Sequence, residues 1–437
     1  MLNKEHNDLL TRVGRGTPTG DLFRRFWWPV ITSERLGGAD GSPKRMRVLG
    51  EDLIVFRDTE GKVGVLQAYC PHRRALLYWG RNEERGLRCA YHGWKFDVSG
   101  QCVDMPTEPP DSTYAARLAT IGYPAEEKGG VIWVYLGPKD KIAALPDYEW
   151  MTVPAENRVV TSFIQESNYL QALEANIDTA HVSYLHSYLD ADAGPQPPQF
   201  MEGYRRMVNG DRSPRLTVKQ TEYGLLYGGR RSLPDGKYYW RMTHWLAPAT
   251  TQLPSTDYGN GTIVVPMDDH SSMSFSLLWH KDKTIPQSTQ SQRRGLVGDD
   301  QGTTFKLSDG YVIDHPRGFV HVDNDYLIDR AMEATKFIGT AGGTAAEDRA
   351  VTETMGPVPD TMGKISDRSE EHLGVSDVAI VAARRALIRM VKALQDGVEP
   401  ELAQRGDLYH VRGADIVTEH EDFEGVLTDY GQQLVTA

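Results

Sequence analysis

Cys70-Pro71-His72 is followed, after sixteen intervening residues, by the segment Cys89-Ala90-Tyr91-His92-Gly93-Trp94. The two segments supply two thiolates and two imidazoles, which are soft-to-borderline metal ligands. Such a set suits either a tetrahedral zinc ion or an iron–sulfur cluster. Pro71 stiffens the first segment, and Gly93 allows the backbone to approach closely in the second. The pattern therefore predicts two rigid ligand loops.

The distribution of the ligands favours a cluster over zinc. Each segment provides one Cys and one His, so the two thiolates can hold one iron while the imidazoles hold another. This is the Rieske arrangement, in which neutral imidazoles replace two thiolates and raise the reduction potential. Zinc fingers more often take both Cys from one loop and both His from one helix. We predict a Rieske [2Fe-2S] cluster, with zinc as the alternative; its ligands are Cys70, His72, Cys89 and His92.

Length and composition limit the class of protein. The chain has 437 residues, enough for two or more packed domains, and a hydrophobic content of 40%, which indicates a globular enzyme. The net charge of −12 argues against non-specific nucleic-acid binding, so an anionic substrate has to meet locally placed Arg or Lys. There is no membrane-length apolar run or signal-peptide core, and the three cysteines give no disulfide framework. We therefore expect a cytoplasmic protein that spans no membrane.

Short alternating strands surround the two ligand segments. Apolar alternation at 46–49, 53–56, 63–66 and 130–137, broken by turn residues, predicts a small β-sandwich that holds the ligand loops. Pro138 and Pro146 then mark a connector. We divide the chain into an N-terminal segment 1–40 that packs on the catalytic domain, a cluster domain 41–140 and a catalytic domain 141–437.

The second half of the chain has a different pattern. Residues 167–189 have the periodicity of a helix, and alternating aromatic-rich segments at 216–279 predict an antiparallel sheet. The polar, Gly-containing stretch 284–302 is interpreted as a mobile loop. A further helix is expected to begin at Ser376-Asp377 and to stop at Gly397. The predicted fold class is α+β, with a β-sandwich domain followed by an antiparallel sheet flanked by helices.

The first predicted helix carries a second group of possible metal ligands, Asp178, His181 and His186. Asp178 and His181 are three residues apart and share a helix face. His181 and His186 are separated by roughly 140° on an ideal helix, so they converge only if the helix is distorted or ends between them. Without the cluster motif elsewhere in the chain, two such histidines could simply pack against neighbouring residues and form hydrogen bonds. Two His and one carboxylate, however, form the facial triad of non-haem Fe(II) oxygenases, and a cluster would supply electrons to such a site.

The two motifs together resemble the catalytic α subunits of Rieske non-haem iron ring-hydroxylating oxygenases over nearly the whole chain. The family pattern Asp-x-x-His-x-x-x-x-His is matched by Asp178, His181 and His186. Three later segments are similar to the phthalate dioxygenase branch, whose oxygenases contain α subunits alone: 324–330, 353–357 and 371–374. By position, the resemblance makes Asp348 the third iron ligand. Glu347 stands where that branch often has Gln, which leaves the choice between the two carboxylates open.

The resemblance also implies cofactors and partners. The cofactors are a Rieske [2Fe-2S] cluster and a mononuclear Fe(II), and the electron donor is a separate NADH-dependent reductase. The chain itself has no Gly-rich dinucleotide-binding motif after a strand. The implied assembly is a homotrimer or a hexamer of two stacked trimers. Within it, electrons cross from His92 of one subunit through Asp178 of the next to His181 on the iron.

The implied activity is the O2-dependent oxidation of an aromatic acid. We predict ring dihydroxylation of a phthalate- or benzoate-type acid in aromatic catabolism; the alternative is O-demethylation of a methoxylated, lignin-type acid. A Rieske electron carrier without oxygenase activity is an alternative from another class. Metal analysis separates them, because a carrier holds only the two cluster irons.

Two arginines are predicted to bind the substrate carboxylate. Strand alternation places Arg241 on one face with Tyr239, Thr243 and Trp245, among aromatic side chains. Arg231 is expected opposite Arg241 across a hairpin through 234–236. Arg suits this role because its planar fork binds a carboxylate through two hydrogen bonds. The alternative is that both arginines lie on the surface or pair with nearby acids.

Overall fold

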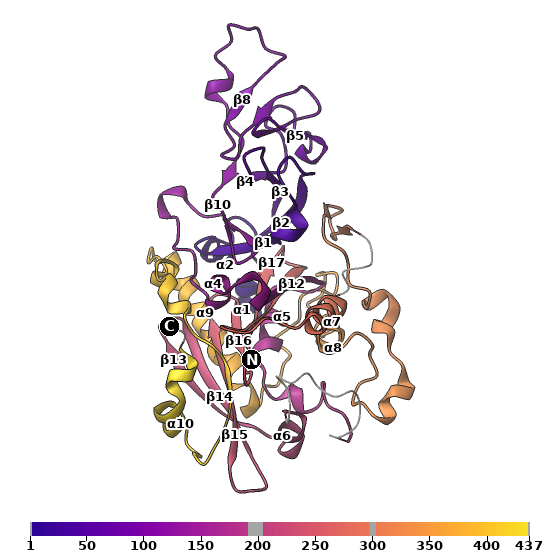
Figure 1. Cartoon of the computed structure of the whole chain (residues 1–437), viewed down its shortest axis with the longest axis vertical. Helices are drawn as coiled ribbons and strands as arrows, with labels where there is room; N and C mark the ends of the chain where they lie inside the picture. The colour runs from indigo at the N-terminus through magenta and orange to yellow at the C-terminus, as the bar shows by residue number, and fades with distance from the viewer. Residues whose placement is uncertain (1, 191–203, 298–302, 436–437) are drawn as a thin grey trace.

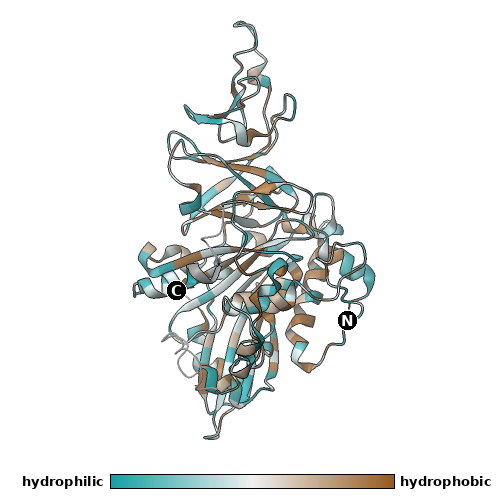
Figure 2. Cartoon of the chain, turned by 90° about the vertical axis from the view of Figure 1, so that its right-hand side faces the viewer, coloured by the Kyte–Doolittle hydropathy of each residue, from teal (hydrophilic) through white to brown (hydrophobic). Residues whose placement is uncertain are grey.

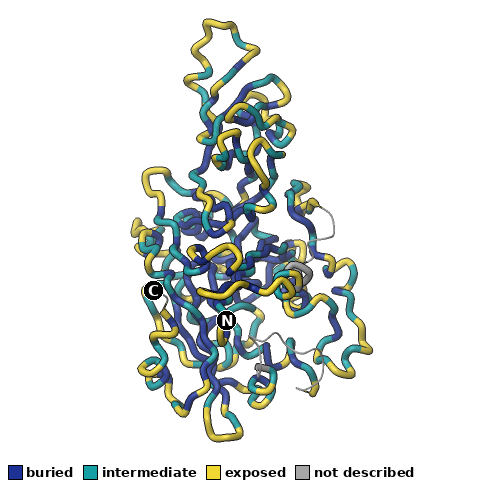
Figure 3. The backbone as a smooth tube through the Cα atoms, viewed as in Figure 1, coloured by how far each residue is buried: buried dark blue, intermediate teal, exposed yellow. Residues whose placement is uncertain are grey.

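The computed structural model describes residues 2–190, 204–297 and 303–435, and it has two lobes. A narrow lobe projects from a broader one that carries both chain termini (Figure 1). Buried backbone is concentrated in the broader lobe, whereas the tip of the projecting lobe is mostly exposed or intermediate (Figure 3). No helix among the described residues is long and apolar enough to cross a membrane.

The projecting lobe contains two four-stranded antiparallel sheets; the strands predicted at 46–49, 53–56 and 63–66 lie in the first, whereas the one predicted at 130–137 lies in neither. The first has the order β2-β3-β4-β9, with β2 Lys44–Val48, β3 Glu51–Arg57, β4 Val63–Gln67 and β9 Gly122–Tyr123. The second has the order β5-β6-β7-β8, with β5 Arg81–Glu83, β6 Gly86–Arg88, β7 Lys95–Phe96 and β8 Cys102–Asp104. The lobe has its own apolar core, which includes Cys70, Cys89 and the third cysteine, Cys102.

A three-stranded sheet joins the projecting lobe to the broader one. Its order is β1-β11-β10, with β1 Trp27–Thr32, β11 Val131–Tyr135 and β10 Ala125–Lys128. Earlier in the chain, α1 (Lys4–Thr11) contacts the broader lobe, where the Tyr169 hydroxyl donates to the Leu10 carbonyl at 2.9 Å. The N-terminal segment thus contacts both lobes, because β1 pairs with β11 across our proposed boundary at residue 40.

The broader lobe is built on an eight-stranded antiparallel sheet. The strand order is β12-β18-β17-β16-β15-β14-β13, and β21 pairs with β15 beyond the end of β16. The strands are β12 Arg158–Gln165, β13 Arg215–Thr221, β14 Gly224–Ser232, β15 Tyr238–Leu246, β16 Thr250–Leu253, β17 Gly259–Pro266, β18 Ser272–Trp279 and β21 Ala414–Thr418. Residues 216–279, predicted as a sheet, contain its strands β13 to β18. Apolar residues recur along these strands (Figure 2).

Two helices connect this sheet to the rest of the lobe. α5 (Tyr169–Ile177) packs on β16 to β18, and α9 (Val378–Gln395) packs on β13 and β14. α9 begins directly after the predicted Ser376-Asp377 start, and Gly397 follows its end with a φ of 86° that favours glycine. The buried Glu174 of α5 accepts hydrogen bonds from Arg368 and Arg384, which ties the two helices together.

The remaining elements are short. The α-helices are α2 Pro18–Phe23, α3 Ser33–Leu36, α4 Glu149–Thr152, α6 Tyr204–Gly210, α7 Gln287–Val297, α8 Thr344–Thr352 and α10 Phe423–Tyr430. A two-stranded sheet is formed by β19 Phe305–Lys306 and β20 Val312–Ile313. Among the 3-10 helices, η1 Leu77–Trp79 follows the first ligand loop, η5 is His181–Ser183, and η8 is Arg330–Ala334.

The predicted loop at 284–302 is wrong over much of its length. Residues 287–297 form the helix α7, and residues 298–302 lie outside the described part of the chain. Tertiary contacts explain the helix: Arg293 donates to Ser276 at 2.7 Å and to Asn260 at 3.1 Å, both on the large sheet. A polar sequence with weak helical periodicity is thus held in place by one arginine anchor.

Candidate active site and cluster site

The two ligand loops of the projecting lobe have the same backbone conformation despite their different sequences. In each loop, the Cys N–H donates to the carbonyl five residues later, and the Cys carbonyl accepts from the N–H four residues later. These bonds are Cys70 to Ala75 at 2.8 Å, Cys89 to Trp94 at 2.8 Å, Arg74 to Cys70 at 2.9 Å and Gly93 to Cys89 at 3.0 Å. Arg74 and Gly93, at equivalent positions, both have positive φ. A Cβ on Gly93 would lie 2.7 Å from Pro106.

Matching loops bring like ligands together. The buried thiols of Cys70 and Cys89 contact each other, and the hydrogen bond between them lowers the pKa of Cys89 to about 6. The imidazole centroids of His72 and His92 are 4.4 Å apart, and His72 stacks on Trp94. One thiol pair and one imidazole pair suit a two-iron cluster. Tetrahedral zinc requires its four ligand atoms to surround one point. Among the described residues, these four side chains do not form such a group.

The second group of predicted ligands follows α5 in the broader lobe. The predicted helix over 167–189 is too long, because α5 ends at Ile177 and Asp178 has an extended backbone. Asp178 Oδ1 accepts the N–H of Ala180 at 2.6 Å, so its side chain competes with the helical hydrogen bonds. The short helix η5 then begins at His181. The helix therefore ends before both histidines, and not between them as one of the two predicted alternatives had it.

Three ligand atoms converge at this point. The Nε2 atoms of His181 and His186 are 3.2 Å apart, and Asp348 Oδ1 lies 3.5 Å from the first and 3.1 Å from the second. Asp348 Oδ1 is buried and makes no hydrogen bond of acceptable geometry among the described residues. All three ligand atoms lie within 4.8 Å of one another. Two imidazoles and one carboxylate in this arrangement fit a mononuclear Fe(II) with open positions.

The local charge also favours a cation. Burial disfavours a charged His186, yet Asp348 and Glu347 outweigh burial and raise the pKa of His186 to about 10. Burial likewise opposes ionisation of Asp348, but the charges of His186 and His181 lower its pKa. A site whose negative potential stabilises an imidazolium also stabilises a metal ion in the same place.

Glu347 and Asp348 lie on different sides of His186. Both belong to α8, where successive side chains diverge by about 100°. Asp348 faces the Nε2 atoms, whereas Glu347 Oε2 lies 2.8 Å from His186 Nδ1. The geometry thus places Asp348, and not Glu347, among the converging ligand atoms, although its role as an iron ligand remains a prediction.

Asp178 lies behind the other histidine. Its Oδ2 is 3.5 Å from His181 Nδ1, and the residue lines the cavity beside the ligand group. Burial opposes ionisation of Asp178, but hydrogen bonds and charge from His181 lower its pKa. The predicted contact therefore exists, but a turn creates it and not a shared helix face.

A cavity of about 170 Å³ opens beside the ligand group, and it contains one of the two predicted arginines. Arg241 lines this cavity, where its Nε donates to Thr179 Oγ1 at 3.0 Å and Nη1 lies 3.9 Å from Asp415 Oδ1. Gly229 is opposite Arg241 in the strand register, and a Cβ there would lie 2.7 Å from the Thr179 methyl. Glycine at 229 thus lets the turn after α5 approach the sheet.

Arg231 has a different position from the one expected. It pairs with Tyr239 in the register of β14 and β15, so it is not opposite Arg241. Its guanidinium is fully buried and donates to the Thr179 carbonyl at 2.8 Å and to Ser183 Oγ at 3.2 Å. Arg231 is not among the described residues that line the cavity. Its contacts support the segment that carries His181, so its position does not favour substrate binding.

Sequence analysis missed two charged residues near the centre, Asp415 and Lys336. Asp415 reaches the cavity from β21, where the Tyr239 hydroxyl donates to it at 2.6 Å. Lys336 pairs with Glu347. Neither residue has a local sequence signal: Asp415 reaches the site through the pairing of β21 with β15, and Lys336 lies in a loop whose position depends on its pairing with residues 187–189.

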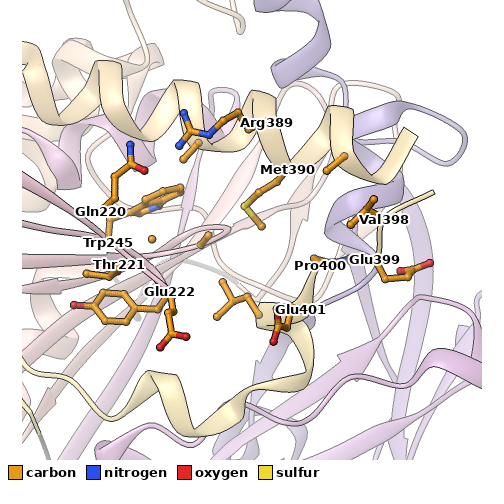
Figure 4. Close-up of a pocket in the computed structure, with 16 residues that line it drawn as sticks. Gln220, Thr221, Glu222, Trp245, Arg389, Met390, Val398, Glu399, Pro400 and Glu401 are labelled. Atoms are coloured by element: carbon orange, nitrogen blue, oxygen red, sulfur yellow. The ribbon is translucent and has the colours of Figure 1, made fainter. Parts of the chain in front are cut away.

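A second cavity, of about 260 Å³, contains none of the predicted site residues. It lies between α9 and the turn that joins β13 to β14, and it is lined by Met390, Trp245 and Leu402 with Arg389 at its edge (Figure 4). Its volume is larger, but the cluster of possible metal ligands is in the other cavity. The chemistry therefore identifies the smaller cavity as the candidate active site.

Comparisons with known families agree with both sites. Residues 26–121 match the Rieske [2Fe-2S] domain, and residues 134–407 match the LigXa C-terminal domain like family. The chain belongs to the Rieske non-haem iron aromatic oxygenases. This membership confirms the predicted cofactors, a Rieske [2Fe-2S] cluster and a mononuclear iron, and the need for a separate reductase.

Individual relatives carry out different reactions. The chain is 38% identical to the phthalate 4,5-dioxygenase oxygenase subunit of Pseudomonas putida, over 91% of this chain and 88% of the relative. It is 28% identical to the 5,5'-dehydrodivanillate O-demethylase oxygenase subunit of Sphingobium sp. (strain NBRC 103272 / SYK-6), over 92% and 83%. The fold also resembles that of dicamba monooxygenase bound to dicamba, with a TM-score of 0.59, 18% identity and coverage of 85% and 98%.

Proposed function

We propose that the chain is the oxygenase component that dihydroxylates the ring of a phthalate- or benzoate-type acid. The observation that carries this proposal is Arg241, a cation in the cavity that also contains His181, His186 and Asp348. Because the whole chain is strongly acidic, an arginine at this place is the local positive charge that an aromatic carboxylate needs. The relative that is 38% identical to this chain is named as a phthalate 4,5-dioxygenase oxygenase subunit, which supports the same substrate class.

The surroundings of Arg241 suit a carboxylate. Burial raises the pKa of the neighbouring Asp415, although the charge of Arg241 opposes the shift. This shift makes Asp415 a weaker competitor of a substrate carboxylate for Arg241. Apolar residues of the cavity, including Ile177, Leu253 and Pro254, provide contacts for an aromatic ring.

We assign roles to the residues of each centre. Cys70, His72, Cys89 and His92 hold the cluster, and His181, His186 and Asp348 hold the iron, which supplies O2 activation when bound. Asp178 orients His181 and is the bridge to the cluster of a neighbouring subunit. The two lobes support transfer between subunits, because the ligand loops belong to the projecting lobe and α5 and α8 to the broader one (Figure 1). The assembly we propose is a homotrimer or a hexamer of stacked trimers.

Oxygen uptake tests the proposed activity. The purified chain would be combined with NADH and a reductase of a related system, and then offered phthalates, benzoates and methoxylated aromatic acids. We expect substrate-dependent uptake with the unmethoxylated acids and a dihydrodiol product. Uptake only with uncharged aromatic compounds would contradict the proposed role of Arg241.

O-demethylation is a second candidate, favoured by the likeness to the 5,5'-dehydrodivanillate O-demethylase subunit. The same iron and the same electrons serve both reactions, which differ in the substrate carbon that is held near the metal. The products separate them, because demethylation releases formaldehyde and leaves a phenol. Stoichiometric formaldehyde from a methoxylated acid would establish the second candidate.

A further inference from the structure

Behind His186 lies a buried ion pair that the proposed reaction does not yet use. Glu347 Oε2 is 2.8 Å from His186 Nδ1, and its other oxygen, Oε1, pairs with the Lys336 ammonium. The side chain of Glu347 is only 3% exposed and that of Lys336 only 11%. Burying an ion pair is costly unless its partners are well placed, so a pair at this position calls for an explanation.

The contact determines which nitrogen of His186 is available to a metal. An ionised carboxylate accepts hydrogen bonds and donates none. When His186 is neutral, as a metal ligand must be, the Nδ1 atom facing Glu347 therefore carries the proton, and the lone pair is left on Nε2. That is the nitrogen that faces Asp348 Oδ1 at 3.1 Å. The tautomer needed for a ligand is thus selected by Glu347 from the opposite side of the ring.

Lys336 is held in place by the segment that follows His186. Residues 187–189 and 335–337 form a short antiparallel pairing: Tyr188 bridges Lys336, Phe337 N–H donates to Ser187 at 3.1 Å, and Leu189 N–H donates to Thr335 at 2.8 Å. The counter-ion of Glu347 is therefore fixed relative to the histidine that Glu347 orients. Helix α8 thus carries the acid of the ion pair, Glu347, and the paired segment 335–337 carries the base, Lys336.

Lys336 supplies positive charge where carboxylates gather. Asp178, Glu347 and Asp348 bring three carboxylates near the two histidines. Lys336 pairs with Glu347 and thus offsets its charge, while the other oxygen of that carboxylate lies 2.8 Å from His186 Nδ1.

We propose that Glu347 and Lys336 act together as positioning residues for the iron, fixing the tautomer and orientation of His186. The inference rests on the assignment of His181, His186 and Asp348 as iron ligands under the proposed function. Carboxylates that accept hydrogen bonds from ligating histidines typically contribute 10- to 100-fold in metal affinity. His181 and Asp178 form a similar contact, with Nδ1 of the ring 3.5 Å from Oδ2 of the carboxylate.

The test measures metal binding directly. Glu347→Gln keeps the shape of the side chain and removes its charge, and Lys336→Met removes the counter-ion. The matched control is Glu333→Gln, which removes an acid paired with Arg330 in the nearby helix η8. For each variant, Fe(II) affinity is measured anaerobically by competition with a chelator, and the Co(II)-substituted form is recorded by visible absorption. The cluster spectrum and the unfolding temperature of the iron-free chain report whether the fold is intact.

We expect Glu347→Gln to weaken Fe(II) binding by about 10- to 100-fold and to alter the Co(II) spectrum, with the cluster spectrum unchanged. The double variant, which combines Glu347→Gln with Lys336→Met, should bind Fe(II) no more weakly than Glu347→Gln alone, because the two residues act as a unit. Glu333→Gln should bind Fe(II) like the parent. Parental affinity and an unchanged Co(II) spectrum in Glu347→Gln would overturn the inference.

Asp348→Ala separates this inference from the assignment of the centre. If Asp348→Ala loses iron while Glu347→Gln only weakens binding, both stand. If Glu347→Gln loses iron as completely as Asp348→Ala, Glu347 is itself a ligand and the positioning role is wrong. If Asp348→Ala retains full iron, the ligand assignment is wrong, whatever Glu347→Gln does.

Discussion

Adjacent acids in α8 serve different nitrogens of one imidazole ring. Asp348 faces Nε2 of His186, and Glu347 faces Nδ1. The difference follows from helix geometry, because neighbouring side chains diverge by about 100°. A similar division applies to the arginines of β14 and β15: Arg241 lines the cavity, whereas Arg231 is buried against the segment 179–183.

Replacing Arg241 with Met should raise the KM for an aromatic acid by about 10- to 100-fold, on the order of 1.5–3 kcal/mol for a lost charge-assisted hydrogen bond. The iron content should not change, because the Arg241 guanidinium contacts Thr179 and Asp415, which are not predicted ligands. Steady-state oxygen uptake gives the KM. Arg230→Met is the matched control, since the neighbouring Arg230 pairs with Glu421 away from the cavity. An unchanged KM in Arg241→Met would remove the arginine from substrate binding.

The thiols offer an equally specific test. Cys70→Ser should abolish the visible spectrum of the cluster, because a serine hydroxyl is a poor replacement for a thiolate ligand. Cys102→Ser is the matched control: Cys102 is buried in the same core, and its thiol contacts the Asp104 carbonyl. The absorption spectrum and iron content of both variants would be compared. A Cys70→Ser protein with a parental spectrum is incompatible with the cluster assignment.

At the scale of single elements, the end of α5 is decisive. If the helix continued beyond Ile177, His181 and His186 would diverge around its axis. Asp178 ends it by accepting the N–H of Ala180, and the same carboxylate lies 3.5 Å from His181 Nδ1. One residue therefore shapes the turn and contacts a predicted ligand.

Asp178→Asn should separate these two functions. The amide oxygen of Asn can still accept the Ala180 N–H, so the turn and the cluster should be retained, and Fe(II) is added in excess so that the iron site stays filled. The charge that links His181 to a neighbouring cluster is lost, and oxidation of the reduced cluster by O2 and substrate should slow by orders of magnitude. A single-turnover experiment, followed by cluster absorption, measures this step. Parental turnover with full iron content would reduce Asp178 to a turn-forming residue.

At the scale of the whole molecule, the two lobes place the two predicted centres in different parts of the chain. The cluster loops belong to the projecting lobe, and α5 and α8 belong to the broader one (Figure 1). The three-stranded sheet β1-β11-β10 and the N-terminal helices join the lobes. This division favours electron transfer between neighbouring subunits, as the proposed ring-shaped trimer requires.

Mixed oligomers test transfer between subunits. A Cys70→Ser chain lacks the cluster and an Asp348→Ala chain lacks the iron, so each homo-oligomer should be inactive. Co-expressed and purified through two different affinity tags, the mixed oligomer should regain activity, because one chain reduces the iron of its neighbour. Adding Asp178→Asn to the Cys70→Ser chain should remove this activity, whereas adding it to the Asp348→Ala chain should not. Mixed oligomers without any activity would contradict the inter-subunit route.

Local sequence was sufficient where the spacing of residues itself carries the chemistry. The Cys-x-His and Cys-x-x-His segments predicted the cluster because each loop needs only a few adjacent residues to form its ligand geometry. Strands β2 to β4, strands β13 to β18 of the large sheet and α9 were predicted because apolar periodicity reflects burial of one face. The five-residue spacing of His181 and His186 also required a distorted or interrupted helix, and α5 ends before both of them.

Tertiary structure decided what depends on contacts between distant segments. The extent of α5 and the formation of α7 depend on Asp178 and Arg293, whose side chains override weak local preferences. Lys336 and Asp415 reach the site through pairing across the chain, which no local pattern records. The register of β14 and β15 separated Arg241 from Arg231 because strand alternation defines a face but not the partner opposite a residue.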